Sequence, residues 1–145
     1  MSELTLTLAL AQTLLADTMK AAREKNLNPC AIAILDARGA LKASGAEDGT
    51  SPLRWKIALA KAAGAVGLGV GSRRIGAMAV ERPHFVAALH GITDGGLVPV
   101  AGGVLIRNAE KHIIGAIGVS GDTSDNDEAV AVAAIVAAGF VADGG

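Results

Sequence analysis

The sequence contains few of the residue types that mark disulfide-rich or nucleic-acid-binding proteins. A single cysteine, Cys30, excludes an intrachain disulfide and a metal site built from several cysteines. Cys30 precedes an apolar run, so a small buried hydrophobic residue is its simplest interpretation. With two Phe, one Trp and no Tyr, the chain lacks a set of aromatic rings on which bases could stack. The net charge of −1 provides no basic field for nucleic acid.

Long hydrophobic runs are also missing. A charged residue or a glycine interrupts every apolar stretch before the ~18 residues that a membrane-spanning helix needs. The first residues, MSELTL, lack the basic region and apolar core of a signal peptide, so we expect a cytoplasmic protein. Apolar residues nevertheless make up 51% of the chain, and its mean hydropathy is +0.45. We therefore expect a homo-oligomer that buries apolar surface between its subunits.

The length of 145 residues fits a single domain that spans residues 1–145. Within it, apolar residues at helical spacing predict a first helix from Leu4 to Lys25. Residues 26–29 are predicted to end this helix. A second helix, rich in small residues, is predicted from about Pro52 to Gly67. Shorter helical segments are predicted over 73–80 and 84–89, and a final helix over about 125–140.

Two β-hairpins are expected between these helices. The apolar run 31–35 and the segment 40–46 flank a tight turn at 36–39. The runs 100–106 and 113–119 flank the polar turn 108–111, and the last residues, 142–145, are expected to fray. This order predicts an α+β fold, an antiparallel sheet with helices packed on it as an α/β/α sandwich.

The stretch from Leu97 to Val130 carries the clearest local signals. Ser120, Gly121 and Asp122 break the last strand of the second hairpin, and the following Ser124–Asp127 has an S-x-x-D capping pattern. A strand that passes into a helix through glycine directs backbone N–H groups at one spot, which favours an anion. Ser120, Gly121 and Asp122 are therefore predicted ligand-binding residues. The acids of 122–128 fail the spacing of a calcium loop, so capping explains them better and we predict no metal site.

Several motifs together resemble one family. They are D36-A-R-G39, E47-D-G49, A60-K-A-A63, G102-G103, I114-G-A-I-G-V-S-G121 and D127-E128. Over essentially the whole chain these are similar to the GlcG/HbpS-like, or haem-degrading, family. The resemblance implies a profilin-like fold with a five-stranded antiparallel sheet and helices on both faces. It also implies dimers or larger assemblies, haem as a cofactor for some members, and a place in catabolic gene clusters.

Candidate site residues follow from the pattern and the resemblance. Lys61 is flanked by alanines in the second helix, and a lysine at this place recurs in the family. We expect it to reach a pocket and pair with Asp48 or with a ligand carboxylate; a solvated lysine at the helix edge is the alternative. Gly102 and Gly103 would let a ligand or a second subunit approach the strand backbone. Arg54 and Lys56 are interpreted as surface charges.

The histidines offer further candidates. His84 and His90 lie in the irregular segment before the second hairpin, where an imidazole could ligate haem iron or act as a general base. Ordinary solvated side chains are the alternative, and His112 is best interpreted as a turn residue. Some haem-binding relatives use a histidine from the first helix, and the first helix here has none.

Three functions remain open. The first is a small-molecule-binding protein of the haem type, with a pocket between the second helix and the second hairpin; substituting His84 or His90 would then weaken hemin binding. The second is a catabolic enzyme, an isomerase or tautomerase, in which Lys61 or a nearby histidine moves a proton on a small carboxylic acid. The third is an oligomeric accessory protein without catalysis.

Overall fold

The computed structural model describes residues 5–93 and 96–145, and these form five helices and a five-stranded sheet. In chain order the elements are α1 (Leu8–Glu24), β1 (Ala31–Asp36), β2 (Leu41–Ala46), α2 (Arg54–Leu68), α3 (Ser72–Glu81), α4 (Pro83–Leu89), β3 (Gly103–Arg107), β4 (Ile113–Ser120), α5 (Ser124–Ala137) and β5 (Val141–Asp143). The strands lie in the order β2-β1-β4-β3-β5, and every neighbouring pair is antiparallel. The predicted α+β fold is confirmed.

Both predicted hairpins form, because a polar side chain closes each turn. The Asp36 carboxylate accepts hydrogen bonds from the backbone N–H groups of Arg38 and Ala40, at 2.9 and 3.0 Å. In the second hairpin Asn108 Oδ1 accepts from the backbone N–H groups of Glu110 and His112, at 3.1 and 2.9 Å. Short side chains that bond the backbone in this way favour turns over continued strand.

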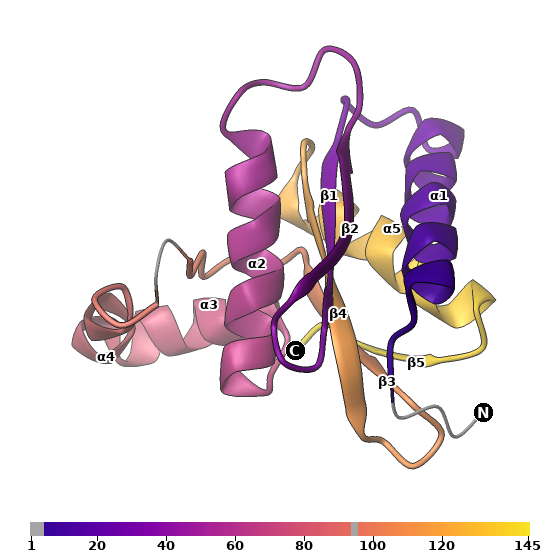
Figure 1. Ribbon diagram of the computed structural model, residues 1–145. Coiled ribbons are helices and arrows are strands. Elements are labelled where there is room, and N and C mark those ends of the chain that lie inside the picture. Colours follow the sequence, from indigo (N-terminus) through magenta and orange to yellow (C-terminus); the bar gives the residue numbers. More distant parts are fainter. Residues whose placement is uncertain (1–4, 94–95) are drawn as a thin grey trace.

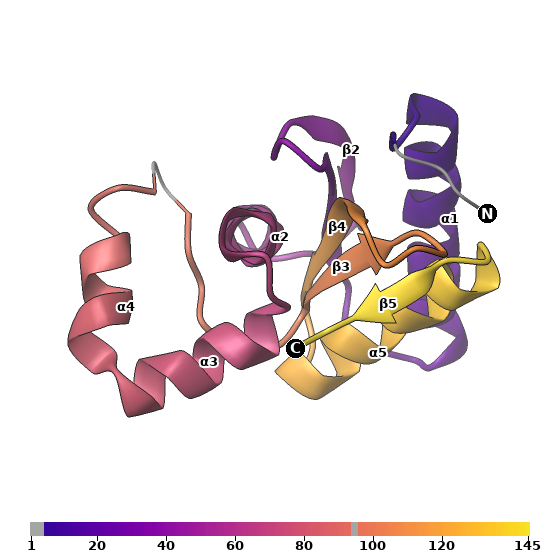
Figure 2. The same cartoon turned by 90° about the horizontal axis from the view of Figure 1, so that it is seen from below.

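Helices cover both faces of the sheet, as the resemblance implied. Figure 1 and Figure 2 show α2 on one face and α1 with α5 on the other. The strand side chains alternate between the two sides. Ile32 and Ile34 of β1 join the core under α1 and α5, whereas Leu35 and Ala116 pack against α2.

A row of small residues brings α2 close to the sheet. Gly103, Gly118, Ala33 and Ser44 stand side by side across β3, β4, β1 and β2. A methyl group at Gly118 would overlap the carbonyl oxygen of Ala58 on α2. The small residues that the sequence places in both elements therefore allow helix and sheet backbones to touch. α2 contacts β4 most extensively and β2 least, so the row is left uncovered at its β2 end.

Two predicted segments differ from the structure at the chain ends. The first helix begins at Leu8, with Thr7 as its N-cap, rather than at Leu4, which lies outside the described residues. The expected frayed tail is wrong, because β5 pairs with β3 and Arg107 Nε bonds Asp143 Oδ2 at 2.9 Å. The chain turns back after α5 at Gly139, whose φ of +87° is a left-handed conformation.

The N-cap of the last helix also lies one residue before the predicted cap. Thr123, not Ser124, is the N-cap of α5, and its hydroxyl accepts from the backbone N–H of Asn126 at 3.2 Å. The helix ends at Ala137, earlier than the predicted end near Phe140.

Helices α3 and α4 form an arm beside the sheet. The predicted short helices are confirmed, and the arm has its own small core of Ile75, Val86, Leu89 and Leu97. Among the described elements α4 packs against α3 alone, and Figure 2 shows it at the outer end of the arm. In the segment that follows α4, residues 94–95 lie outside the described residues. No helix within 5–93 and 96–145 has the length and apolar character needed to cross a membrane.

Candidate functional site

Lys61 and Asp127 form a buried ion pair between α2 and α5. Lys61 Nζ lies 3.2 Å from Asp127 Oδ2, and the two side chains are 2% and 1% exposed. The ammonium also donates to the carbonyl oxygen of Val119 at 2.9 Å. Burial lowers the pKa of Lys61, and the neighbouring Asp127 carboxylate opposes that shift. Both charges therefore depend on each other inside the protein.

The carboxylate of Asp127 also holds the turn that follows β4. Its Oδ1 accepts the backbone N–H of Asp122 at 2.9 Å. Asp122 in turn accepts from the Asn126 side chain and from the backbone N–H groups of Asn28 and Thr123. These hydrogen bonds lower the pKa of Asp122 to about 2, and the bond from Asn126 has the largest effect. The backbone N–H of Asp122, which was expected to face an anionic ligand, is thus bonded to the Asp127 carboxylate of the chain itself.

Ser120 and Gly121 lie in the same closed region. Ser120 is buried, and its Oγ accepts from Arg54 Nη1 at 3.2 Å. A Cβ at Gly121 would lie 2.7 Å from the Cα of Cys30. Cys30 itself is buried as predicted, and burial is the main cause that raises the pKa of its thiol to about 11. This thiol is protonated near neutral pH.

Gly102 and Gly103 accommodate α2. Gly102 has a φ of +125°, and a Cβ there would lie 2.7 Å from Lys61 Nζ. A Cβ at Gly103 would overlap the carbonyl oxygen of Lys61, and the Gly103 N–H donates to Ser72 Oγ at 2.6 Å. The close approach that the sequence predicted at these glycines is therefore made by the chain's own helices, in place of a ligand or a second subunit.

The remaining candidates lie away from this ion pair. Asp48 is exposed, so its proposed pairing with Lys61 is wrong: the sequence signal could not choose among carboxylates, and the fold brings Asp127 to the ammonium. His84 and His90 are exposed at the two ends of α4, which contacts no element except α3 among those described. The structure therefore does not bring them to Lys61. His112 is exposed in the turn before β4.

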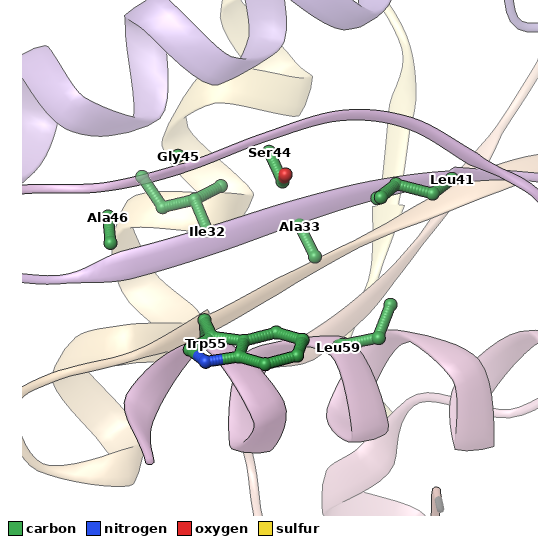
Figure 3. Close-up of a pocket in the computed structure, with 8 residues that line it drawn as sticks. All are labelled: Ile32, Ala33, Leu41, Ser44, Gly45, Ala46, Trp55 and Leu59. Atoms are coloured by element: carbon green, nitrogen blue, oxygen red, sulfur yellow. The ribbon is translucent and has the colours of Figure 1, made fainter. Parts of the chain in front are cut away.

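A different cavity lies between α2 and the edge strand β2. It measures about 300 Å³, and its lining consists of Ile32, Ala33, Leu41, Ser44, Gly45, Ala46, Trp55 and Leu59. We call it the α2–β2 groove. Figure 3 shows Trp55 and Leu59 on α2 opposite the strands that carry Ala33 and Ser44. The groove is the uncovered β2 end of the row of small residues on which α2 packs.

Cations precede and follow Trp55, which lines this apolar groove. The indole of Trp55 is 53% exposed, and Lys56 Nζ lies 5.6 Å from its ring centroid. Arg54 begins α2, and its described polar partner is the neutral hydroxyl of Ser120. No carboxylate within residues 5–93 and 96–145 pairs with it. An apolar wall with positive charges beside it suits a flat, apolar ligand that carries carboxylates.

Sequence reasoning missed this groove. The sequence pattern indicates surface charges at Arg54 and Lys56 and assigns no role to Trp55 between them. The chain's single Trp, placed between two cations at the start of a helix, was the available signal. Lys61 lines neither this groove nor the two other described cavities. Within the described residues, no three His, Cys, Asp or Glu side chains gather to hold a metal ion.

Comparisons with known proteins agree on one group. A family model for haem-degrading, HbpS-like proteins matches residues 6–136. A structure of the PduOC:heme complex is 21% identical, with a TM-score of 0.82 over 94% of this chain and 96% of that one. Protein ORFY of Klebsiella pneumoniae, a DUF336 protein, is 27% identical, with a TM-score of 0.81 over 94% and 92%.

A double mutant of HbpS from Streptomyces reticuli gives similar values. It is 25% identical, with a TM-score of 0.80 over 94% of this chain and 89% of that one. No curated protein matches the chain. The matching structures share the described fold over nearly their whole length.

Proposed function

The chain belongs to the family of haem-degrading, HbpS-like proteins, and from this premise we propose that it binds haem, or a similar carboxylated tetrapyrrole, in the α2–β2 groove. The observation that carries the proposal is the combination of an apolar groove, an indole at its edge and cations beside it. The neighbour whose structure is a heme complex supports the same ligand class.

The lining suits the ring of a tetrapyrrole. Ala33, Leu41 and Leu59 offer aliphatic surface, and the exposed Trp55 offers a flat ring for stacking. The groove's volume of about 300 Å³ is at the lower end of the range for ligand pockets. A ligand of haem's size would therefore be covered on one face and open on the other.

The cations suit the carboxylates of the ligand. Arg54 has no carboxylate partner among the described residues, and a guanidinium can hold a carboxylate through two parallel hydrogen bonds. Lys56, beside the indole, can serve as a second point charge. These two residues would orient the acidic edge of the ligand toward the beginning of α2.

The groove fits the ring of haem better than it fits the iron. Haem would supply a redox-active iron when bound, but the groove lining contains no imidazole, thiol or thioether. The residues of this chain contribute an apolar wall and a cationic edge, and we assign them no step at the iron.

The buried state of Lys61 favours binding over the proposed isomerase chemistry. A general base must lie within hydrogen-bond reach of its substrate. Lys61 is 2% exposed, and its ammonium already bonds Asp127 and Val119. Its surroundings are those of a structural ion pair.

An absorbance titration with hemin tests the proposal. Trp55→Ala should raise the Kd at least about tenfold, because it removes the stacking surface. Val136→Ala, at an exposed residue of α5 outside the groove, is the matched control and should leave the Kd unchanged. Absence of hemin binding, or equal binding by the Trp55 variant, would overturn the proposed site.

The carboxylate contact has its own test. Arg54→Gln should weaken hemin binding several-fold while it weakens binding of the hemin dimethyl ester much less. Arg74→Gln, at an exposed arginine that pairs with Glu81, is the control. Equal losses for acid and ester would show that Arg54 does not bind the carboxylates.

A further inference from the structure

We propose that the α2–β2 groove recognises the ring and carboxylates of a tetrapyrrole without an iron ligand from this protein, so that metal-free porphyrin binds as well as haem. The inference rests on the proposed function and adds the chemical class of ligand that the groove accepts. It departs from the expectation that His84 or His90 holds the iron.

The histidines of the chain lie outside the lining of the groove. The iron of haem proteins is held by His, Cys, Met or Tyr. The chain has three histidines and no tyrosine. His84 and His90 are exposed on α4, which packs against α3 alone among the described elements, and His112 is exposed in the turn before β4. None of the three lines the groove.

The sulfur ligands are also elsewhere. Cys30 is fully buried and donates to the carbonyl oxygen of Asn28 at 3.2 Å. Because burial raises the pKa of its thiol to about 11, the thiolate that iron requires is scarce near neutral pH. Met19 on α1 and Met78 on α3 are half-buried and do not line the groove, and Met1 lies outside the described residues.

The groove itself offers contacts that do not depend on a metal. Its polar side-chain groups are the Ser44 hydroxyl and the Trp55 N–H, and neither is among the usual iron ligands. The remaining contacts are apolar surface and the indole ring, with the ammonium of Lys56 beside that ring. Protoporphyrin IX presents the same ring edge and the same two carboxylates as haem. The free energy of binding should therefore be nearly the same for both ligands.

The test compares hemin with metal-free protoporphyrin IX on two proteins. These are the unaltered chain and a variant that combines His84→Ala, His90→Ala and His112→Ala. All three positions are exposed, so the variant should retain its fold, which circular dichroism can verify. The Kd values for the two ligands should agree within about threefold, and the triple variant should keep both Kd values and the absorption spectrum of bound hemin.

The outcomes separate this inference from the proposed function. If hemin binds tenfold or more tightly than protoporphyrin IX, the inference is overturned while the binding function stands. Loss of hemin binding alone in the triple variant would also overturn it, since an imidazole, including one from a second copy, would then hold the iron. If neither ligand binds the unaltered chain, the proposed function itself fails.

Discussion

Lys61 and Asp127 are the most completely buried charges among the described residues. Removing a charge from water is costly, and here the cost is offset by the pairing and by bonds to Val119 and Asp122. Glycine at 102 leaves the space in which the ammonium lies. The pair joins α2 to the beginning of α5 across the sheet, so its first role is in the fold.

Removing one partner of the Lys61–Asp127 pair should therefore lower the free energy of unfolding more than removing both. We expect Asp127→Asn to lower the free energy of unfolding by about 3–5 kcal/mol, because Lys61 would keep a buried charge without its counter-ion. The double variant Lys61→Met, Asp127→Leu should recover most of that loss. Urea denaturation followed by circular dichroism measures both.

An exposed ion pair provides the control. Lys20 and Glu24 lie 3.9 Å apart on α1, with side chains 75% and 65% exposed. Lys20→Met should change the free energy of unfolding by no more than about 0.5 kcal/mol. If Asp127→Asn lowered the free energy of unfolding as little as Lys20→Met, the structural role of the buried pair would be contradicted.

Asp122 predicts a dependence of stability on pH. Its pKa is about 2 in the folded protein, against 3.8 for an unperturbed aspartate. A carboxyl group with a lowered pKa stabilises the fold while it is ionised, fully above about pH 4, and this contribution is lost as the pH falls toward 2. The difference in urea midpoint between the unaltered chain and Asp122→Ala should thus shrink between pH 6 and pH 2. An equal difference at both values would contradict this prediction.

At the scale of elements, the contact of α2 with the sheet decides where the groove lies. Gly103 and Gly118 allow the helix to sit on β3 and β4, and the same row of small residues ends uncovered at Ala33 and Ser44. The helix covers the sheet up to β1 and leaves the edge strand open. The same row of small residues thus allows α2 to pack closely on β3 and β4 and leaves the proposed ligand groove open at β2.

Two glycines give a matched test of that contact. Gly118→Ala should lower the free energy of unfolding by about 2 kcal/mol or more, because the new methyl group would overlap the Ala58 carbonyl. Gly67→Ala on α2 meets no atom within 4 Å and should leave stability unchanged or raise it by up to about 1 kcal/mol. Thermal or urea unfolding compares the two, and equal effects would argue against the tight helix–sheet contact.

At the scale of the whole molecule, several large apolar side chains are exposed to water. Leu41 and Trp55 line the groove, Val80 lies on α3, and Ile92 follows α4. Val80 is 84% exposed. Such surface is costly in water, so self-association stays our prediction for this chain.

Light scattering after size-exclusion chromatography measures that association. The unaltered protein should have a mass that is a multiple of the 14.4 kDa chain. Val80→Lys should shift it toward the monomer, whereas Val136→Lys, at a 59% exposed valine of α5, should not. A monomeric unaltered protein would refute the prediction. If both variants shift the measured mass equally, the result would show that the arm is not part of the interface.

Much of the fold was predictable because its signals are local. Asp36 and Asn108 close turns by accepting hydrogen bonds from backbone N–H groups a few residues away. The apolar runs 31–35 and 113–119 predict strands directly. β5 was missed because three residues carry no period, and their pairing with β3 depends on a distant strand. The N-cap of α5 was misplaced by one residue because Thr123 and Ser124 are both residue types that cap helices.

The sequence by itself determined the order of the elements from α1 to α5, the burial of Cys30 and the small residues that meet at the helix–sheet contact. The tertiary structure alone decided that Asp127 and not Asp48 pairs with Lys61, and that His84 and His90 lie on an arm away from it. It also brought Trp55 beside the open face of β2. The physical reason is range: periodicity and turn chemistry act between near neighbours, whereas ion pairs and grooves join residues that only packing brings together.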